Sequence, residues 1–225
     1  MQKDLVTLLD WTADDIRQVL DLACTLKSRA QAGELEQTLP NKTLALIFEK
    51  SSMRTRVSFE VAMTQLGGTS IYLSKQDVNL GQREPVKDGA RVLARYVNGV
   101  AARTYEHDTV KKLAAQADIP VINALSDLYH PCQALADILT IREKFDELQG
   151  LKVSYVGDGN NVARSLAVAC GKLGADLTVA SPVHYQFSED FQQRLDELNG
   201  ESGGHFHLTE LPEKAVEEAR VVYTD

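Results

Sequence analysis

The chain has 225 residues, of which 44% are hydrophobic and 25% are charged, the usual proportions for a globular protein. Its formal net charge of −8 argues against general binding to nucleic acids or anionic membranes, because phosphate-rich partners would be repelled overall. We expect neither a membrane span nor a secretory signal, since no apolar run approaches roughly 18 residues and the first nine residues have no apolar core. The three cysteines are far apart and show no metal-ligand spacing, which favours a reducing, cytoplasmic setting.

Strand-like and helix-like patterns alternate through the first part of the chain. The predicted elements are a helix capped by Thr12, a strand at 43–48, a helix with Val57, Val61 and Leu66 on one stripe, a strand at 70–73, a helix opened by Pro85, a strand at 99–102, a helix at 110–117 and a strand at 121–124. Such alternation predicts a parallel sheet that is covered by helices on both faces.

A long helix at 133–148, closed by Gly150, precedes a second series of strands and helices. Predicted strands at 151–156, 177–180, 206–208 and 221–224 enclose helices at 162–173, around 191–198 and at 213–219. We therefore predict two parallel-sheet α/β domains, 1–133 and 150–225, joined by the helix 134–149, with a ligand site in the cleft between them. The last predicted strand has no covering helix after it, so we expect the second domain to be incomplete.

The strongest chemical signal is the segment Ser51-Ser52-Met53-Arg54-Thr55-Arg56, between the strand at 43–48 and the next helix. A turn from strand to helix presents free backbone N–H groups and the positive end of the helix dipole. Ser52 and Thr55 add hydroxyl donors, and the two arginines add guanidinium groups suited to phosphate oxygens. The segment predicts a phosphate site; by itself it also fits a capped helix with two solvated arginines.

Three other positions are candidate site residues. His130 and Gln133 begin the long helix, where a histidine can donate a hydrogen bond to a carbonyl oxygen that gains negative charge in a transition state. Arg103 follows the strand at 99–102, at the strand end where open α/β sheets bind ligands. A helix-capping histidine and a surface arginine remain the alternatives at these positions.

The segment Gly157-Asp158-Gly159-Asn160-Asn161 follows the first strand of the second domain. A dinucleotide-binding G-x-G-x-x-G would require glycine where Val162 stands, so a nucleotide site is not favoured. The paired asparagines offer amide donors and acceptors to a polar small molecule, or equally a tight turn and a helix cap.

These segments together resemble the aspartate and ornithine carbamoyltransferase family. Residues 52–56 are similar to its S-x-R-T-R carbamoyl phosphate motif, 130–133 to its H-P-x-Q motif, and 157–161 to the G-D-x-x-N segment of the ornithine branch. Met53 replaces the more usual threonine. Arg164 lies near the position of an arginine that the aspartate branch uses, but the paired asparagines favour ornithine. The end of the chain, 221–225, is similar to the strand that leads into a D-x-x-S-M-G loop, of which only Asp225 is present.

The resemblance implies transfer of the carbamoyl group of carbamoyl phosphate to the side-chain amine of L-ornithine, giving L-citrulline and phosphate in arginine metabolism. It implies carbamoyl phosphate binding by Ser52, Met53, Arg54, Thr55, Arg56, Arg103, His130 and Gln133, with catalytic roles for Arg103, His130 and Gln133, and ornithine binding by Asn160, Asn161 and Asp225. It implies a homotrimer in which Gln82 and Arg83 reach a neighbouring subunit's site. No metal or other cofactor is expected, because positioning and preorganised charge perform the chemistry.

Two alternatives remain open at this point. The acceptor could be another amine, namely N-acylornithine, putrescine or aspartate. The chain could also be a catalytically incomplete fragment that binds carbamoyl phosphate without turning it over.

Overall fold

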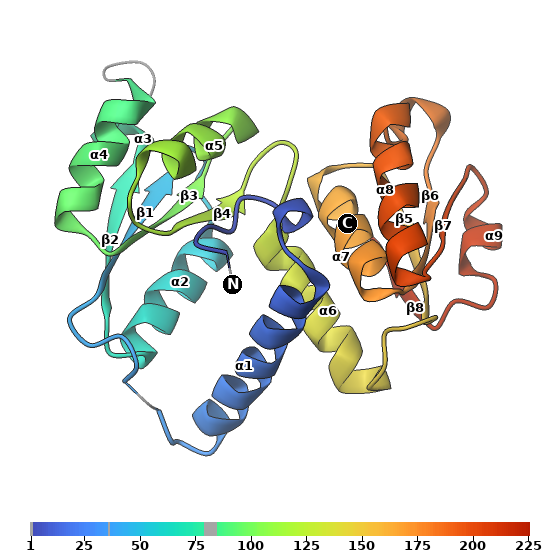
Figure 1. The fold of residues 1–225 in the computed structure, drawn as a ribbon, viewed down its shortest axis with the longest axis horizontal. Helices are drawn as coiled ribbons and strands as arrows, with labels where there is room; N and C mark the ends of the chain where they lie inside the picture. The colour runs from blue at the N-terminus through green and yellow to red at the C-terminus, as the bar shows by residue number, and fades with distance from the viewer. Residues whose placement is uncertain (1, 36, 79–84) are drawn as a thin grey trace. The chain divides into compact units, whose positions relative to one another are not determined.

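The computed structural model describes residues 2–35, 37–78 and 85–225, and the chain divides into two compact units (Figure 1). Unit 1 comprises Met1–Thr7 and Asp21–Tyr129, and unit 2 comprises Leu8–Leu20 and His130–Asp225. Helix α1 (Ala13–Gln31) starts in unit 2 and ends in unit 1. Within the part of the chain that the structure describes, no helix is both long and apolar enough to cross a membrane.

Unit 1 is built on a parallel sheet in the order β2-β1-β3-β4. Its strands are β1 (Thr43–Phe48), β2 (Thr69–Ser74), β3 (Gly99–Arg103) and β4 (Val121–Leu125). Leu5 extends the sheet beyond β4, because it forms a parallel bridge with Ile122. All four strands predicted for this part of the chain are therefore present.

Helices cover both faces of the unit 1 sheet, which explains the unbroken apolar run of β1. Ala45 and Ile47 face a core that α4 (Val86–Tyr96) and α5 (His107–Gln116) complete. Leu46 and Phe48 alternate with them and face α2 (Met53–Gln65) on the other side. A strand with successive side chains on opposite faces can be apolar throughout only when both faces are buried. The short helix α3 (Lys75–Val78) follows β2 directly.

The orientation of α2 differs from the simplest interpretation of its sequence. Met63 is buried and Phe59 is partly buried against the sheet, whereas Val57 and Val61 of the predicted apolar stripe are 50% and 46% exposed. Gly67, with a φ of 83°, follows the last turn, as the Gly67-Gly68 pair predicts. The stripe of Val57 and Val61 thus lies on the surface of unit 1.

Unit 2 has a second parallel sheet, in the order β7-β6-β5-β8. Its elements are η1 (Leu8–Asp10), α6 (Pro131–Phe145), β5 (Lys152–Val156), α7 (Asn161–Leu173), β6 (Asp176–Ala180), η2 (Val183–Tyr185), α8 (Glu189–Ser202), β7 (Phe206–Thr209), α9 (Pro212–Val216) and β8 (Val221–Tyr223). Helix α7 packs against α6 and α8 and is buried along nearly its whole length. Both units therefore have the predicted parallel α/β architecture.

Two helix boundaries in unit 2 correct the sequence-based expectation. Helix α6 begins at Pro131 and ends at Phe145, earlier than the predicted end at 148, because Asp146 takes a φ of 60° and closes the helix in place of Gly150. Helix α9 ends at Val216 and does not reach 219; Glu218 likewise has a positive φ, of 62°. Positive φ values are uncommon in residues other than glycine, so the sequence did not predict them.

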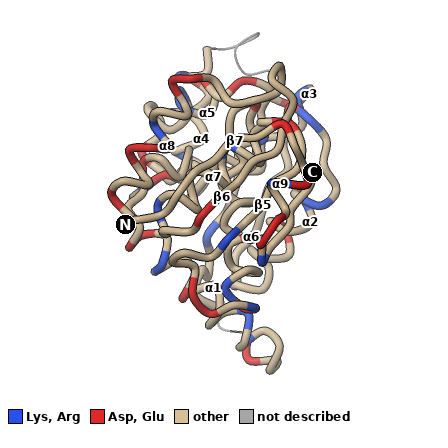
Figure 2. Tube along the Cα trace, turned by 90° about the vertical axis from the view of Figure 1, so that its right-hand side faces the viewer, with Lys and Arg blue, Asp and Glu red and all other residues tan. Residues whose placement is uncertain are grey.

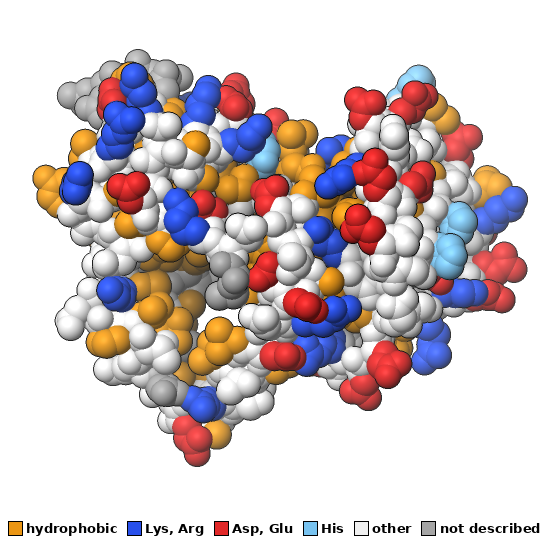
Figure 3. Space-filling model, viewed as in Figure 1, with side chains coloured by type: hydrophobic (Ala, Val, Ile, Leu, Met, Phe, Trp, Pro, Cys, Tyr) orange, Lys and Arg blue, Asp and Glu red, His pale blue; other side chains and the backbone are white. Residues whose placement is uncertain are grey.

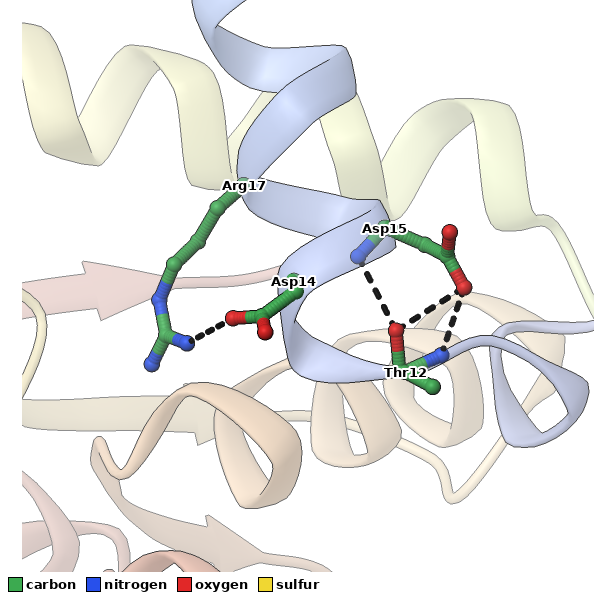
Figure 4. Close-up of polar contacts among 4 residues, drawn as sticks. All are labelled: Thr12, Asp14, Asp15 and Arg17. Carbon is green, nitrogen blue, oxygen red and sulfur yellow. Dashed lines mark hydrogen bonds and ion pairs between the residues drawn. The ribbon is translucent and has the colours of Figure 1, made fainter. Parts of the chain in front are cut away.

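The start of α1 has the predicted cap (Figure 4). Thr12 Oγ1 accepts a hydrogen bond from the Asp15 N–H at 3.1 Å, and Asp15 Oδ2 accepts from the Thr12 N–H at 3.2 Å. This reciprocal arrangement satisfies two N–H groups that have no helical acceptor. Arg17 pairs with Asp14 on the exposed side of the same turn, at 3.0 Å. Figure 2 shows acidic and basic residues interspersed along the Cα trace.

Candidate functional site

Ser52 fixes the turn that joins β1 to α2 in unit 1. It is the N-cap residue in extended backbone geometry, and its Oγ accepts from the Thr55 N–H at 3.4 Å and donates to Thr55 Oγ1 at 3.0 Å. The first turn of a helix keeps N–H groups without a helical acceptor, and they carry the positive end of the dipole. Met53 and Arg54 occupy this turn, with exposed side chains. The geometry of a helix N-terminus that can receive an anion is therefore present at the predicted segment.

Arg103 reaches the same turn from the adjacent strand. It ends β3 opposite Phe48 of β1, and its Nη1 donates to Thr55 Oγ1 at 3.4 Å. Its Nε is buried and has no hydrogen-bond partner among the described residues. Burial lowers the pKa of Arg103 from its ordinary value, and the nearby positive charge of Arg54 lowers it further. Two guanidinium groups that repel each other, one with an unused donor, favour binding of an anion.

Arg56 has a different environment from the other two arginines. Its Nε donates to Glu60 Oε1 at 2.8 Å, and its guanidinium carbon lies 3.9 Å from the centre of the Tyr72 ring. Two lysines that the sequence interpretation did not single out, Lys50 and Lys75, lie over the Tyr105 ring of the same unit. The contacts of Arg56 with Glu60 and with the Tyr72 ring give it a role in the packing of α2 against β2, besides any contact with a ligand.

In unit 2, His130 and Gln133 begin α6 around Pro131, as predicted. His130 is the N-cap residue, and its backbone N–H donates to Ser165 Oγ of α7 at 2.7 Å. The same Oγ donates to the Asn161 carbonyl at 2.8 Å. The Gln133 amide nitrogen donates to Asp137 Oδ1, one turn further along α6, at 2.9 Å. Ser165 and Asp137 thus hold two predicted site residues, and sequence reasoning had assigned neither a role.

The segment after β5 forms the start of α7. Asn160 Oδ1 accepts from the Val162 and Ala163 N–H groups at 2.9 and 3.0 Å, so this side chain is the helix cap. Its amide nitrogen donates to Asp225 Oδ2 at 3.2 Å, which brings together two of the three predicted acceptor-binding residues. Gly159 must be glycine, because an added Cβ would lie 2.7 Å from the Tyr185 carbonyl oxygen. The turn-and-cap alternative therefore describes Asn160, while Asn161 is the first residue of α7.

Aromatic residues of β5 and β8 lie beside this segment. The rings of Tyr155 and Tyr223 stack with their centres 5.6 Å apart, and the Tyr155 hydroxyl donates to Asn160 Oδ1 at 3.5 Å. Burial, with the negative charge of Asp225, raises the pKa of Tyr155 to about 12. The tyrosine is therefore neutral at physiological pH and acts as a hydrogen-bond donor. Gln82 and Arg83, the predicted neighbouring-subunit loop, lie outside the described residues.

Comparison with known proteins gives consistent matches along the chain. The family model "Aspartate/ornithine carbamoyltransferase, carbamoyl-P binding domain" matches residues 3–143, and the model "Aspartate/ornithine carbamoyltransferase, Asp/Orn binding domain" matches residues 149–225. An ornithine carbamoyltransferase of Halalkalibacterium halodurans is 50% identical over 223 residues, which are 99% of this chain and 70% of the relative. That of Bacillus subtilis is 49% identical and is covered to 69% of its length.

Solved structures that match this chain are also ornithine carbamoyltransferases. The ornithine carbamoyltransferase from Pyrococcus furiosus matches with a TM-score of 0.97 and 51% identity, over 99% of this chain and 71% of that one. Anabolic ornithine carbamoyltransferase from Campylobacter jejuni matches with a TM-score of 0.92 and 38% identity, over 100% of this chain and 73% of that one.

Proposed function

This chain belongs to the aspartate/ornithine carbamoyltransferase family, and on that premise we propose that it transfers the carbamoyl group of carbamoyl phosphate to the side-chain amine of L-ornithine, giving L-citrulline and phosphate. The observation that carries the proposal is the arrangement of Thr55, Arg54 and Arg103 at the start of α2, where hydroxyl, guanidinium and helix N-terminus converge. We place the reaction in arginine biosynthesis and in the cytoplasm. The matched relative from Pyrococcus furiosus is named anabolic.

We assign the binding of the two substrates to different parts of the chain. Residues 1–133 would bind carbamoyl phosphate, 134–149 would link the halves, and 150–225 would bind ornithine. Ser52, Arg54, Thr55 and the backbone of Met53 would hold the phosphate, as the capped turn supports. Arg56 would have a more peripheral contact, because Glu60 and Tyr72 already engage its guanidinium.

The chemistry requires charge stabilisation at the carbamoyl carbonyl. The neutral amine nitrogen of ornithine attacks the carbamoyl carbon, and the new C–N bond forms as negative charge develops on the carbonyl oxygen. The C–O bond to phosphate then breaks, phosphate leaves with the electron pair, and the attacking nitrogen loses a proton. Arg103 and His130 would donate hydrogen bonds to the developing oxyanion and Gln133 would orient the carbamoyl amide, so all three act through position and charge.

The acceptor end of the site supports ornithine over aspartate. Asp225 would bind the α-ammonium group and Asn161 the α-carboxylate, while Asn160, occupied as the helix cap, would hold Asp225 in place. The second carboxylate of aspartate would need a cation in this segment. The guanidinium of Arg164 lies 3.8 Å from the centre of the Phe191 ring, where it packs against α8. Arg164 is therefore poorly suited to that task.

We also propose that the chain assembles as a homotrimer. The exposed side chains of Met53, Val57 and Val61, spaced four residues apart, give α2 of unit 1 an apolar surface that suits a protein contact. Figure 3 shows hydrophobic side chains reaching the surface around α2. Light scattering would test this; a mass equal to the 24.8 kDa of one chain would contradict the proposal.

The function is tested by incubating the 225-residue chain with carbamoyl phosphate and each candidate amine, and by measuring the ureido product. We expect citrulline from ornithine and little product from putrescine, N-acetylornithine or aspartate. Arg54→Ala should weaken carbamoyl phosphate binding by roughly 2–5 kcal/mol if the arginine is a desolvated partner of the phosphate. Arg17→Ala, which removes an exposed arginine on α1, is the matched control. Binding without any product would favour the alternative of a fragment that binds but does not react.

A further inference from the structure

Asp137, a partly buried carboxylate, accepts a hydrogen bond from the Gln133 side chain. Both residues lie on α6 one turn apart, and Asp137 Oδ1 accepts a hydrogen bond from the Gln133 amide nitrogen at 2.9 Å. A carboxylate has only acceptors, so it selects the nitrogen end of the amide and leaves the carbonyl oxygen, Oε1, at the other end. The carbamoyl group presents an NH₂, which needs an acceptor.

We propose that Asp137 is a positioning residue that fixes the Gln133 amide with Oε1 toward the carbamoyl NH₂, and that it thereby makes the site selective for carbamoyl phosphate over other acyl phosphates. The inference rests on the proposed function, because it takes Gln133 as the residue that meets the carbamoyl group. Without Asp137 the amide can turn over, and its NH₂ would then face the donor NH₂ of the ligand. A site that must hydrogen-bond a ligand group discriminates strongly against an analogue without it.

The surroundings of Asp137 distinguish this role from an ordinary pair along a helix. Burial raises the pKa of Asp137 and is the largest influence on it, so an ionised carboxylate here is costly unless neighbours hold it. The hydrogen bond from Gln133 and the nearby hydroxyl of Tyr223 act in the opposite direction and lower the pKa. An exposed side-chain pair would avoid this cost altogether. The partly buried position instead places the carboxylate near both Gln133 of α6 and Tyr223 of β8, the strand that leads to Asp225.

Among the described residues, the ionisable groups that influence Asp137 or are influenced by it are Tyr223, Cys170 and Asp225. Tyr223 of β8 and Cys170 of α7 both have pKa values raised chiefly by burial, to about 12 for the thiol, so both are neutral near pH 7. Asp225 is the remaining neighbour, and its negative charge raises the pKa of Asp137. As the pH falls through that raised pKa, Asp137 gains a proton and can donate to Oε1, which lets the Gln133 amide reverse. Selectivity should therefore fall in acid.

The test compares carbamoyl phosphate with acetyl phosphate, which has the same phosphate and carbonyl groups and a methyl group in place of the NH₂. Calorimetric titration of the full chain should show that the wild type prefers carbamoyl phosphate. Asp137→Leu should lower that preference by about tenfold, the equivalent of one hydrogen bond, with little change for acetyl phosphate. Thr140→Val is the matched control, since Thr140 is exposed on the same helix and bonds only the Ala136 carbonyl in the described structure.

A second variant keeps the test decisive if Asp137→Leu does not fold. Asp137→Asn retains an oxygen acceptor, so it should keep part of the preference, and that preference should no longer change with pH as it does in the wild type. Two results would overturn the role of Asp137 and leave the proposed function intact. One is an unchanged ratio of the affinities for carbamoyl phosphate and acetyl phosphate in Asp137→Leu. The other is a preference that varies with pH in Asp137→Asn as much as it does in the wild type. A wild-type chain that binds neither phosphate would overturn the proposed function, and this inference with it.

Discussion

The hydroxyl of Ser165 offers a direct measure of what holds the start of α6 in unit 2. Ser165 is 2% exposed, and its hydroxyl accepts from the His130 N–H and donates to the Asn161 carbonyl. Ser165→Ala keeps Cβ and removes only the oxygen. The Asn161 carbonyl still has its helical partner within α7, whereas the His130 N–H loses this acceptor. Because that hydrogen bond is partly buried, we expect a loss of about 1–2 kcal/mol of unfolding free energy, the lower part of the range for an unsatisfied donor.

Ser154 is the matched control within the same unit. It lies on β5 with no exposed surface, and its Oγ has no hydrogen-bond partner among the described residues. Ser154→Ala also removes a serine Oγ, but no hydrogen bond is lost with it. The free energy of unfolding should therefore fall by less than about 0.5 kcal/mol, or it should increase.

Trp11 provides the assay for both variants. It is the only tryptophan of the sequence, is 6% exposed and belongs to unit 2, so its fluorescence during urea unfolding reports on that unit. The reasoning is refuted if Ser165→Ala and Ser154→Ala unfold with the same free energy. It is also refuted if Ser165→Ala is the more stable of the two.

Two further predictions concern ionisable groups. Hydrogen bonds from the Thr12 hydroxyl and N–H lower the pKa of Asp15, so its contribution to stability is present above the ordinary carboxyl pKa and is lost as the pH falls through the lower folded-state value. Asp15→Asn should lose that part of the acid sensitivity in urea unfolding at a series of pH values; an unchanged pH profile would contradict this. Burial raises the pKa of the Cys132 and Cys170 thiols to about 12, so both should react with iodoacetamide more slowly than Cys24 at neutral pH. Mass spectrometry of the folded chain measures this, and equal rates at the three thiols would be inconsistent with it.

Local sequence patterns predicted most of the fold because the strands are short, with three to six residues each. The strand at 43–48 has the predicted limits, since both faces are buried and every residue from 44 to 48 is apolar. The end of α6 was wrong by three residues because Asp146 adopts a positive φ, which its side chain does not signal. The position of Val57 and Val61 on the surface depends on which side of α2 meets the sheet, and two competing apolar sides cannot be ranked from one sequence.

The candidate site was predictable where its residues follow strands. Thr55 and Arg103 are 48 positions apart, yet Arg103 ends β3 and Thr55 comes after the neighbouring parallel strand β1, so their contact is the expected consequence of the sheet order. Asp137 and Ser165 were missed because each contributes through a hydrogen bond to a site residue on another turn or another helix. The available signal was their spacing, since each is a polar residue four positions after a named site residue, Gln133 or Asn161.

The course of the backbone through the two units sets an order for its synthesis on the ribosome. Residues 8–20 belong to unit 2, although the rest of that unit begins only at His130. The Trp11 carbonyl accepts from the Nζ of Lys172, at the far end of α7. A nascent chain therefore makes an early part of unit 2 long before the helix that covers it exists, while most of unit 1 can already assemble. At about 5–20 residues per second, this segment waits for roughly 8–30 seconds with its apolar side chains unprotected, and during that time a chaperone can bind it.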